Sequence, residues 1–283
     1  MPSVLPLLFF LAVFSSPWVT AQQDTRPRNS LNAAFEKGNL MVALSEVEWR
    51  PGLTMAAARL NAGATISLNL TLRPATRYVF IASTANGDAS DVDLYLRDGT
   101  GRILAEDHDA DGTPILEFKT TEGGAHQIQL HLAGSDRVEE FVALSLLRGG
   151  GRIILREEYE KTTQNFFRLA NVNRSNFEGT EWLSRPGQWC LLGYSVGKDQ
   201  GITLRNIRPG EGHTYFAAAG SSTLSNIDLY LANRSLRIVE KDIGPGAKPI
   251  LRHKTDLGMN YDLRIEVESN KGTGLLLVAI FQN

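Results

Sequence analysis

The sequence has one cysteine, Cys190, so no disulfide bond can form within the chain. Cys190 is flanked by Trp189, Leu191 and Leu192, a setting that indicates a buried, unreactive thiol. Without disulfides, an exported protein must gain its stability from the size of its core or from a bound metal.

An excess of charge of one sign is also lacking. The chain has 29 Lys and Arg against 31 Asp and Glu, a net charge of −2. No basic stripe follows the chain, so we expect no nucleic-acid partner. The chain also has no acidic tail of the kind that indicates disorder.

Known catalytic motifs are missing. The sequence has no His-Glu-x-x-His pair, no Gly-x-Ser-x-Gly turn and no Gly-Lys-Ser/Thr phosphate loop. His126 and His131 are an odd number of residues apart in a strand pattern, which puts them on opposite faces. We therefore predict no catalytic residue and a non-enzymatic protein. A hydrolase with carboxylates dispersed along the chain, meeting between two domains, stays an alternative because such pairs leave no local signature.

The N-terminal 21 residues are typical of a signal peptide. An apolar run at 4–14 is followed by small residues at Val19-Thr20-Ala21, where cleavage would leave Gln22 first. Pro6 and Pro17 interrupt this stretch, which is shorter than the roughly 20 apolar residues that span a bilayer. We expect export to the periplasm or the outside, with no membrane span in the mature chain.

A repeat organises the rest of the chain. Asp93 corresponds to Asp228 at a spacing of 135 residues, and this spacing continues without a gap to Thr120 and Thr255. Of the 28 paired positions, 12 are identical. Near the ends of the two repeats, residues 142–144 match 278–280 at a spacing of 136. Self-similarity of this kind indicates one structural unit used twice. We predict copy one over residues 22–148 and copy two over 152–283, joined by three glycines at 149–151.

Most of each copy alternates between apolar and polar residues. The pattern predicts strands at 78–81, 92–96, 115–118, 128–132 and 141–144, and Gly- and Asp-rich turns separate them. No helix-length segment lies between successive strands, which favours antiparallel sandwiches over a parallel sheet. Each copy opens with one short helix, which we expect to cover an edge or end of its sandwich. The predicted fold is all-β, two tandem jelly-roll-like sandwiches. The helices have these predicted apolar faces: Leu31, Ala34, Phe35, Met41 and Val42 in copy one, and Tyr159, Phe166, Phe167 and Ala170 in copy two.

An acidic turn in copy one is the sharpest local signal. Asp107, Asp109 and Asp111 alternate, so one turn can direct all three carboxylates at a point, and Asp91 and Asp93 precede them. Clustered hard oxygens suit calcium, although Asp and Gly also favour a solvated turn without a metal. We predict that these five residues hold calcium.

Copy two keeps only part of this set. Asp93 and Asp107 recur as Asp228 and Asp242, whereas Asp91, Asp109 and Asp111 are replaced by Asn226, Gly244 and Gly246. Any complete metal site therefore belongs to copy one. The acids kept in both copies fit a structural role, such as accepting hydrogen bonds from turn amides.

Several segments of the chain resemble bacterial pre-peptidase C-terminal domains. The resemblance covers residues 78–146 and, more weakly, 215–281. It implies a jelly-roll-like sandwich of the kind appended to secreted peptidases, some with calcium near equivalent loops, and an accessory or binding role. No catalytic domain accompanies it here. The segments that carry it are Asp93-Leu94-Tyr95-Leu96, residues 101–104, the acidic turn, and residues 114–118 and 123–132.

Paired aromatic residues are the candidate ligand-binding side chains. Tyr95 matches Tyr230, and Trp49 matches Trp182. If exposed, the rings of Tyr95, Tyr230 and Trp182 can stack on sugars or peptide side chains; if buried, they are core. We expect an exported protein that binds a protein or polysaccharide partner at the cell envelope or outside. A purely structural envelope component is a further alternative.

Overall fold

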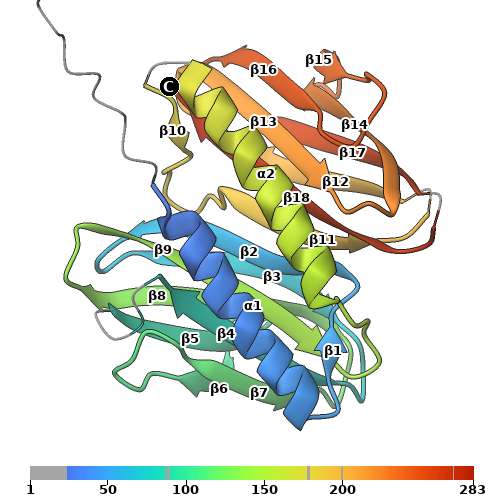
Figure 1. The fold of residues 1–283 in the computed structure, drawn as a ribbon. Coiled ribbons are helices and arrows are strands. Elements are labelled where there is room, and N and C mark those ends of the chain that lie inside the picture. Colours follow the sequence, from blue (N-terminus) through green and yellow to red (C-terminus); the bar gives the residue numbers. More distant parts are fainter. Residues whose placement is uncertain (1–23, 86, 88–89, 177–178, 199, 270) are drawn as a thin grey trace, which may run out of the picture.

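The structure, a computed structural model, describes residues 24–85, 87, 90–176, 179–198, 200–269 and 271–283. The predicted signal peptide, residues 1–21, lies outside the described residues. Each copy has one helix followed by antiparallel strands, so the prediction of antiparallel sandwiches is confirmed. Two helices, one large sheet and two small sheets form three layers (Figure 1).

Copy one contains a helix and nine strands among its described residues. They are α1 (Arg26–Leu44), β1 (Glu48–Trp49), β2 (Gly52–Asn61), β3 (Thr65–Leu72), β4 (Arg77–Thr84), β5 (Ser90–Asp98), β6 (Ile103–Asp107), β7 (Ile115–Lys119), β8 (Gly124–Ser135) and β9 (Glu139–Arg148).

Copy two repeats this order over its described residues. Its elements are α2 (Arg156–Asn176), β10 (Glu181–Trp182), β11 (Leu191–Val196), β12 (Gly201–Ile207), β13 (Gly212–Gly220), β14 (Leu224–Asn233), β15 (Ile238–Asp242), β16 (Ile250–Thr255), β17 (Tyr261–Ser269) and β18 (Gly274–Gln282).

Each copy folds as a sandwich of equal topology. The small sheets have the orders β3-β8-β5-β6 and β12-β17-β14-β15. The facing strands belong to a ten-stranded sheet with the order β16-β13-β18-β11-β2-β9-β4-β7, in which β1 pairs with β9 and β10 pairs with β18. Inward side chains of both sheets form the sandwich core, for example Leu94 of the small sheet and Phe80 of the large sheet in copy one.

The two copies share one sheet. The corresponding strands β2 and β11 pair antiparallel, with Ala56 opposite Leu192 and with Met55 and Ala57 opposite Gly193 and Leu191. This pairing relates the copies by an approximate two-fold axis. Backbone hydrogen bonds therefore continue from one sandwich into the other, and neither copy has a free sheet edge at the join.

The helices lie across the large sheet, on the face opposite the small sheets (Figure 1). Helix α1 contacts β9 and β4, and α2 contacts β13 and β18. The prediction of short helices at an edge or end is therefore wrong: they have 19 and 21 residues and cover a face. The physical reason is that this face is apolar. Val79, Ile81 and Ala143 project from it and need cover.

Helix α1 sits against Trp49, which is fully buried. Gly38 makes this contact possible, because a Cβ there would lie 2.5 Å from Cη2 of Trp49. The Trp49 indole donates a hydrogen bond of 3.1 Å to Oδ1 of Asn39, and its ring stacks on Phe35 at 5.2 Å. A glycine is thus required at position 38 for the helix to approach the sheet.

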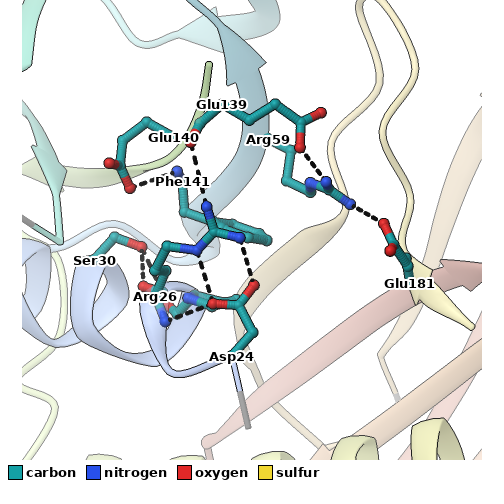
Figure 2. Close-up of polar contacts among 9 residues, drawn as sticks. Asp24, Arg26, Ser30, Arg59, Glu139, Glu140, Phe141 and Glu181 are labelled. Carbon is teal, nitrogen blue, oxygen red and sulfur yellow. Dashed lines mark hydrogen bonds and ion pairs between the residues drawn. The ribbon is translucent and has the colours of Figure 1, made fainter. Parts of the chain in front are cut away.

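A charged cluster joins the two copies near the start of α1 (Figure 2). The Arg59 guanidinium of β2 pairs with Glu139 of copy one and, at 2.8 Å, with Glu181 of copy two. Burial lowers the pKa of Arg59, but the hydrogen bonds to Glu181 and Glu139 more than offset this and raise it. Arg26 reaches the same region through a hydrogen bond of 3.3 Å to the backbone carbonyl of Glu139. The join is therefore held by side-chain ion pairs as well as by the shared sheet.

Within the part of the chain that the structure describes, neither helix has the length and apolarity to cross a membrane.

Candidate binding face

The outer face of the small sheet in copy one carries an ordered set of polar side chains. Strand alternation sends Leu94 and Ile128 into the core and their neighbours outward. Pairing places the outward residues in rows across β3, β8, β5 and β6. We call this set the polar face; its members are Thr65, Ser67, Asn69, Asp93, Tyr95, Arg97, Glu106, Gln127, Gln129 and His131.

Hydrogen bonds between rows and strands hold these side chains in place. Gln127 Nε2 donates to Asn69 Oδ1 at 3.1 Å, and Arg97 Nε donates to Gln129 Oε1 at 2.8 Å. The Thr65 hydroxyl and Nδ1 of His131 are 3.0 Å apart. Side chains that are already ordered lose less conformational entropy when a ligand binds. The face is therefore preorganised.

Tyr95 is the aromatic residue at the middle of the polar face. Its hydroxyl donates to Asp93 Oδ2 at 3.2 Å, and Asp93 is the next residue on the same face of the strand, so the ring lies along the strand. The Arg97 guanidinium is 5.9 Å from the ring centroid. Desolvation, followed by the charge of Asp93, raises the pKa of Tyr95. The half-exposed ring thus stays neutral and offers an apolar surface with a polar tip.

A shallow pocket of about 440 Å³ adjoins the polar face. Asn69 and Gln127 line it on one side, and the turn at Asp98–Gly101 lines it on the other. Asp98 fixes this turn by accepting hydrogen bonds from the backbone N–H groups of Thr100, at 2.9 Å, and Arg102, at 3.0 Å. Chiefly the Thr100 hydroxyl, with these amides, lowers the pKa of Asp98 to about 2. The pocket wall is therefore anionic and rigid at neutral pH.

The corresponding face of copy two differs in kind. Tyr230 lies at the place of Tyr95, but Arg264 lies 4.5 Å from its ring centroid, on the neighbouring strand. Arg264 also pairs with Glu266, which stands opposite Asp228. Charged side chains thus occupy the outer face of copy two, where they pair with one another. Tyr95 and Tyr230 are both half-exposed, as a binding role needs, but only Tyr95 has uncharged polar neighbours such as Gln129.

Trp182 is part of the core. Its side chain is 3% exposed and contacts Phe281 at 4.6 Å and Phe141 at 5.9 Å between ring centroids. Helix α2 covers it with Phe166 and Phe167. The binding role expected for Trp182 is replaced by a core role, the alternative that the sequence left open.

Of the acids kept in both copies, Asp107 and Asp242 stabilise turns, as the repeat predicted, whereas Asp93 and Asp228 lie within β5 and β14 and accept hydrogen bonds from side chains. Asp107 Oδ2 accepts a hydrogen bond of 2.8 Å from the backbone N–H of Ile115, and Asp242 Oδ2 accepts one of 2.8 Å from that of Ile250. The other oxygens accept from Asp109 N at 3.3 Å and Gly244 N at 3.2 Å. This shared role explains why both copies keep the residue without any need for a metal.

The remaining predicted calcium ligands are unequal in their surroundings. Oδ1 of Asp91 is buried without a partner, and desolvation, then Asp93 and Asp111, raise the pKa of Asp91. Asp109 and Asp111 are exposed. In copy two, Asn226 replaces Asp91 and donates to Asp228 Oδ1 at 3.1 Å.

Within the described residues, no three or more His, Cys, Asp or Glu side chains are arranged as a metal site. Asp88, a further candidate, lies outside the described residues. Calcium binding by Asp91, Asp93, Asp107, Asp109 and Asp111 stays a prediction.

Sequence reasoning missed the carboxamides of the polar face. Asn69 belongs only to an Asn-x-Thr glycosylation sequence, Gln127 and Gln129 belong to no motif, and only strand pairing brings the three together. A signal was present in the alternation of residues 128–132, whose polar positions all point away from the core.

No protein-family model matches the chain, and no curated protein sequence matches it. Among solved structures, similarity extends to the tandem CBM51 modules of a family 98 glycoside hydrolase from Streptococcus pneumoniae, with a TM-score of 0.22 and 8% identity over 79% of this chain and 83% of that one. The tandem CBM22 domain of Xyn10C from Paenibacillus barcinonensis has a TM-score of 0.22 and 13% identity, over 84% of this chain and 93% of that one. The secreted serine protease VesC from Vibrio cholerae has a TM-score of 0.23 and 11% identity, over 83% of this chain and 48% of that one. The similarity is remote, and it supplies no ligand for this chain.

Proposed function

We propose that this chain is an exported, non-enzymatic binding protein that holds a protein or polymer partner at the cell envelope or outside. The polar face of copy one is the binding surface, and copy two is its structural support. The resemblance of residues 78–146 to pre-peptidase C-terminal domains supports an accessory role of this kind. Calcium bound by the acidic residues near Asp91 would stiffen copy one.

The asymmetry between the two outer faces is the observation that carries this proposal. Both copies keep the same strand order and the same turn acids. Copy two pairs its outward charges with one another, as Arg264 does with Glu266. Copy one instead aligns Gln129 beside Tyr95, where both keep atoms free for a ligand. In a duplicated fold, such a difference is expected when one copy binds and the other supports.

A hydrolase with an active site between the copies finds less support. Glu139 and Glu181, two carboxylates at the join, are both paired with Arg59 (Figure 2). A carboxylate held by a guanidinium is a weak general base and cannot serve as a proton donor.

The test compares two matched double variants. Tyr95→Ala/Gln129→Ala removes one cross-strand pair of the polar face, and Tyr230→Ala/Arg264→Ala removes the corresponding pair in copy two. The mature chain, residues 22–283, is immobilised and incubated with the envelope and secreted fractions of the organism that makes it. We expect retained material to fall on the order of tenfold with the copy-one variant and to be unchanged with the copy-two variant. Equal retention by both variants would contradict the proposal.

A further inference from the structure

The structure assigns a ligand class to the polar face: we propose that it binds a neutral polysaccharide laid across β3, β8 and β5, with one sugar unit or branch in the adjoining pocket. This inference rests on the proposed binding function and specifies it.

Hydrogen-bonding capacity is the first argument. After the internal bonds between Gln127 and Asn69, the Asn69 amide keeps its NH₂ group and Gln127 keeps its carbonyl oxygen. Gln129 likewise accepts from Arg97 and keeps its NH₂ group. Donors and acceptors therefore alternate along the face. A sugar hydroxyl both donates and accepts, so a polyhydroxylated chain matches this pattern better than a carboxylate or phosphate chain does.

Charge points to a neutral chain. Arg97 is the only Lys or Arg of the polar face, and Asp93 and Glu106 oppose it. Asp98 adds a carboxylate, ionised at neutral pH, to the pocket wall. An anionic polymer would meet repulsion here, and a nucleic acid would find no row of cations for its phosphates.

A protein partner fits this face less well. The described residues of β3, β5 and β8 include no exposed large apolar side chain, and on β6 only Ile103, opposite Arg97 at the edge of the sheet, is one. Protein interfaces of ordinary stability centre on buried aromatic and apolar anchors. Tyr95 is the one phenol ring of the polar face; it lies along the sheet, with the Gln129 amide opposite it on β8 and Glu106 opposite it on β6. A pyranose ring, with an apolar C–H face and a rim of hydroxyls, is complementary to this arrangement.

Dimensions agree with a short stretch of polymer. Neighbouring strands are about 4.8 Å apart, so the width from β3 across β8 to β5 is roughly 10 Å, enough for a short stretch of sugar units. The pocket continues the face at its Asn69 and Gln127 end. Its volume of about 440 Å³ lies within the usual range for small-molecule sites.

The experiment uses purified polymers and the mature chain. Affinity electrophoresis and titration calorimetry are run with hydroxyethylcellulose and galactomannan as neutral probes, and with polygalacturonate and alginate as anionic probes. We expect at least one neutral polymer to bind and neither anionic polymer to bind. Tyr95→Ala and Asn69→Ala/Gln127→Ala should weaken binding on the order of tenfold, Tyr95→Phe should keep most of it, and Tyr230→Ala should not change it.

Thermal melting of each variant separates loss of folding from loss of binding. Binding of the neutral polymer that is unaffected by Tyr95→Ala and Asn69→Ala/Gln127→Ala would overturn the assignment, and so would binding of anionic polymers alone. If neither neutral probe binds while a protein partner is retained through the polar face in the fraction test, the ligand class is wrong and the binding function stands. If nothing depends on the polar face in either test, both proposals fail.

Discussion

The indole of Trp189 donates a hydrogen bond of 3.0 Å to the backbone carbonyl of Ser67. Trp189 precedes β11 of copy two, whereas Ser67 lies on β3, in the small sheet of copy one. The bond therefore links copy two to the layer of copy one that does not share strands with it. This hydrogen bond, the β2–β11 pairing and the Arg59 ion pairs together connect the two copies.

We expect a single cooperative unfolding transition for the whole chain. Because the copies share a sheet, neither can unfold without breaking the backbone hydrogen bonds of the other. Differential scanning calorimetry should give equal calorimetric and van't Hoff enthalpies. Trp189→Phe should remove one hydrogen bond, about 1 kcal/mol, and lower the melting temperature by roughly 2–4 °C while the transition stays single. Two resolved transitions would show that the copies are independent.

Gly38→Ala should destabilise the protein despite the higher helix propensity of alanine. The added methyl group would overlap the Trp49 ring, and such overpacking costs about 1–3 kcal/mol. We expect the melting temperature to fall by roughly 5 °C. Leu40→Ala, two residues further along α1 at an exposed position, is the matched control and should change stability by less than about 0.5 kcal/mol. Equal melting temperatures for the two variants would argue against the close approach of α1 to the sheet.

Asp98 should titrate well below an ordinary aspartate. Its pKa is lowered from 3.8 to about 2, so its contribution to stability is complete above pH 4 and is lost as the pH falls towards 2. In copy two, Asn233 accepts the equivalent backbone hydrogen bonds from Ser235 and Arg237 without a charge. Asp98→Asn should therefore keep the turn and remove this part of the acid sensitivity.

Denaturant unfolding at pH 5 and pH 2.5 checks the Asp98 prediction. The stability difference between the two pH values should be smaller for Asp98→Asn than for the unmodified chain. A carboxyl resonance of Asp98 that titrates near 3.8 in an NMR titration would contradict it.

Asp91→Asn should stabilise copy one in the absence of calcium. The pKa of Asp91 is raised, so its ionisation opposes folding, and its contribution to stability decreases as the pH rises through that pKa. Asparagine at this place donates to the neighbouring aspartate, as Asn226 does to Asp228. We expect a gain of roughly 2–4 °C in melting temperature at pH 7 and a smaller gain at pH 4.

Bound calcium would reverse the expected effect of Asp91→Asn on the melting temperature. If Asp91, Asp93 and Asp111 share a calcium ion, added calcium should raise the melting temperature of the unmodified chain and not that of Asp91→Asn. Asp109→Ala/Asp111→Ala is the second variant expected to lose the response. A melting temperature that is the same in calcium and in chelator, with no heat in a calcium titration, would end the metal prediction.

Particular residues show how far the sequence alone predicts this fold. The matching residues Asp107 and Asp242 predicted two equivalent turns. In the structure, each accepts the equivalent backbone hydrogen bond of its own copy. Residues 142–144 and 278–280, however, matched at a spacing that is two residues too long. Leu147 and Phe281, the partners of Trp49 and Trp182, correspond at 134. A slip of two residues keeps every side chain on its face, so identity alone could not reveal it.

The amino-acid sequence determined the duplication, five strands of copy one (β4, β5, β7, β8 and β9), and the helices with their apolar faces, because each depends on periodicity within a short segment. Tertiary structure decided the pairing of β2 with β11, the placement of α1 and α2 over the large sheet, the burial of Trp182 and the alignment of Asn69, Gln127 and Gln129. Those features depend on which strand edges and apolar faces meet. Backbone hydrogen-bonding groups are the same at every residue except proline, so the choice of partner is made only when the whole core packs.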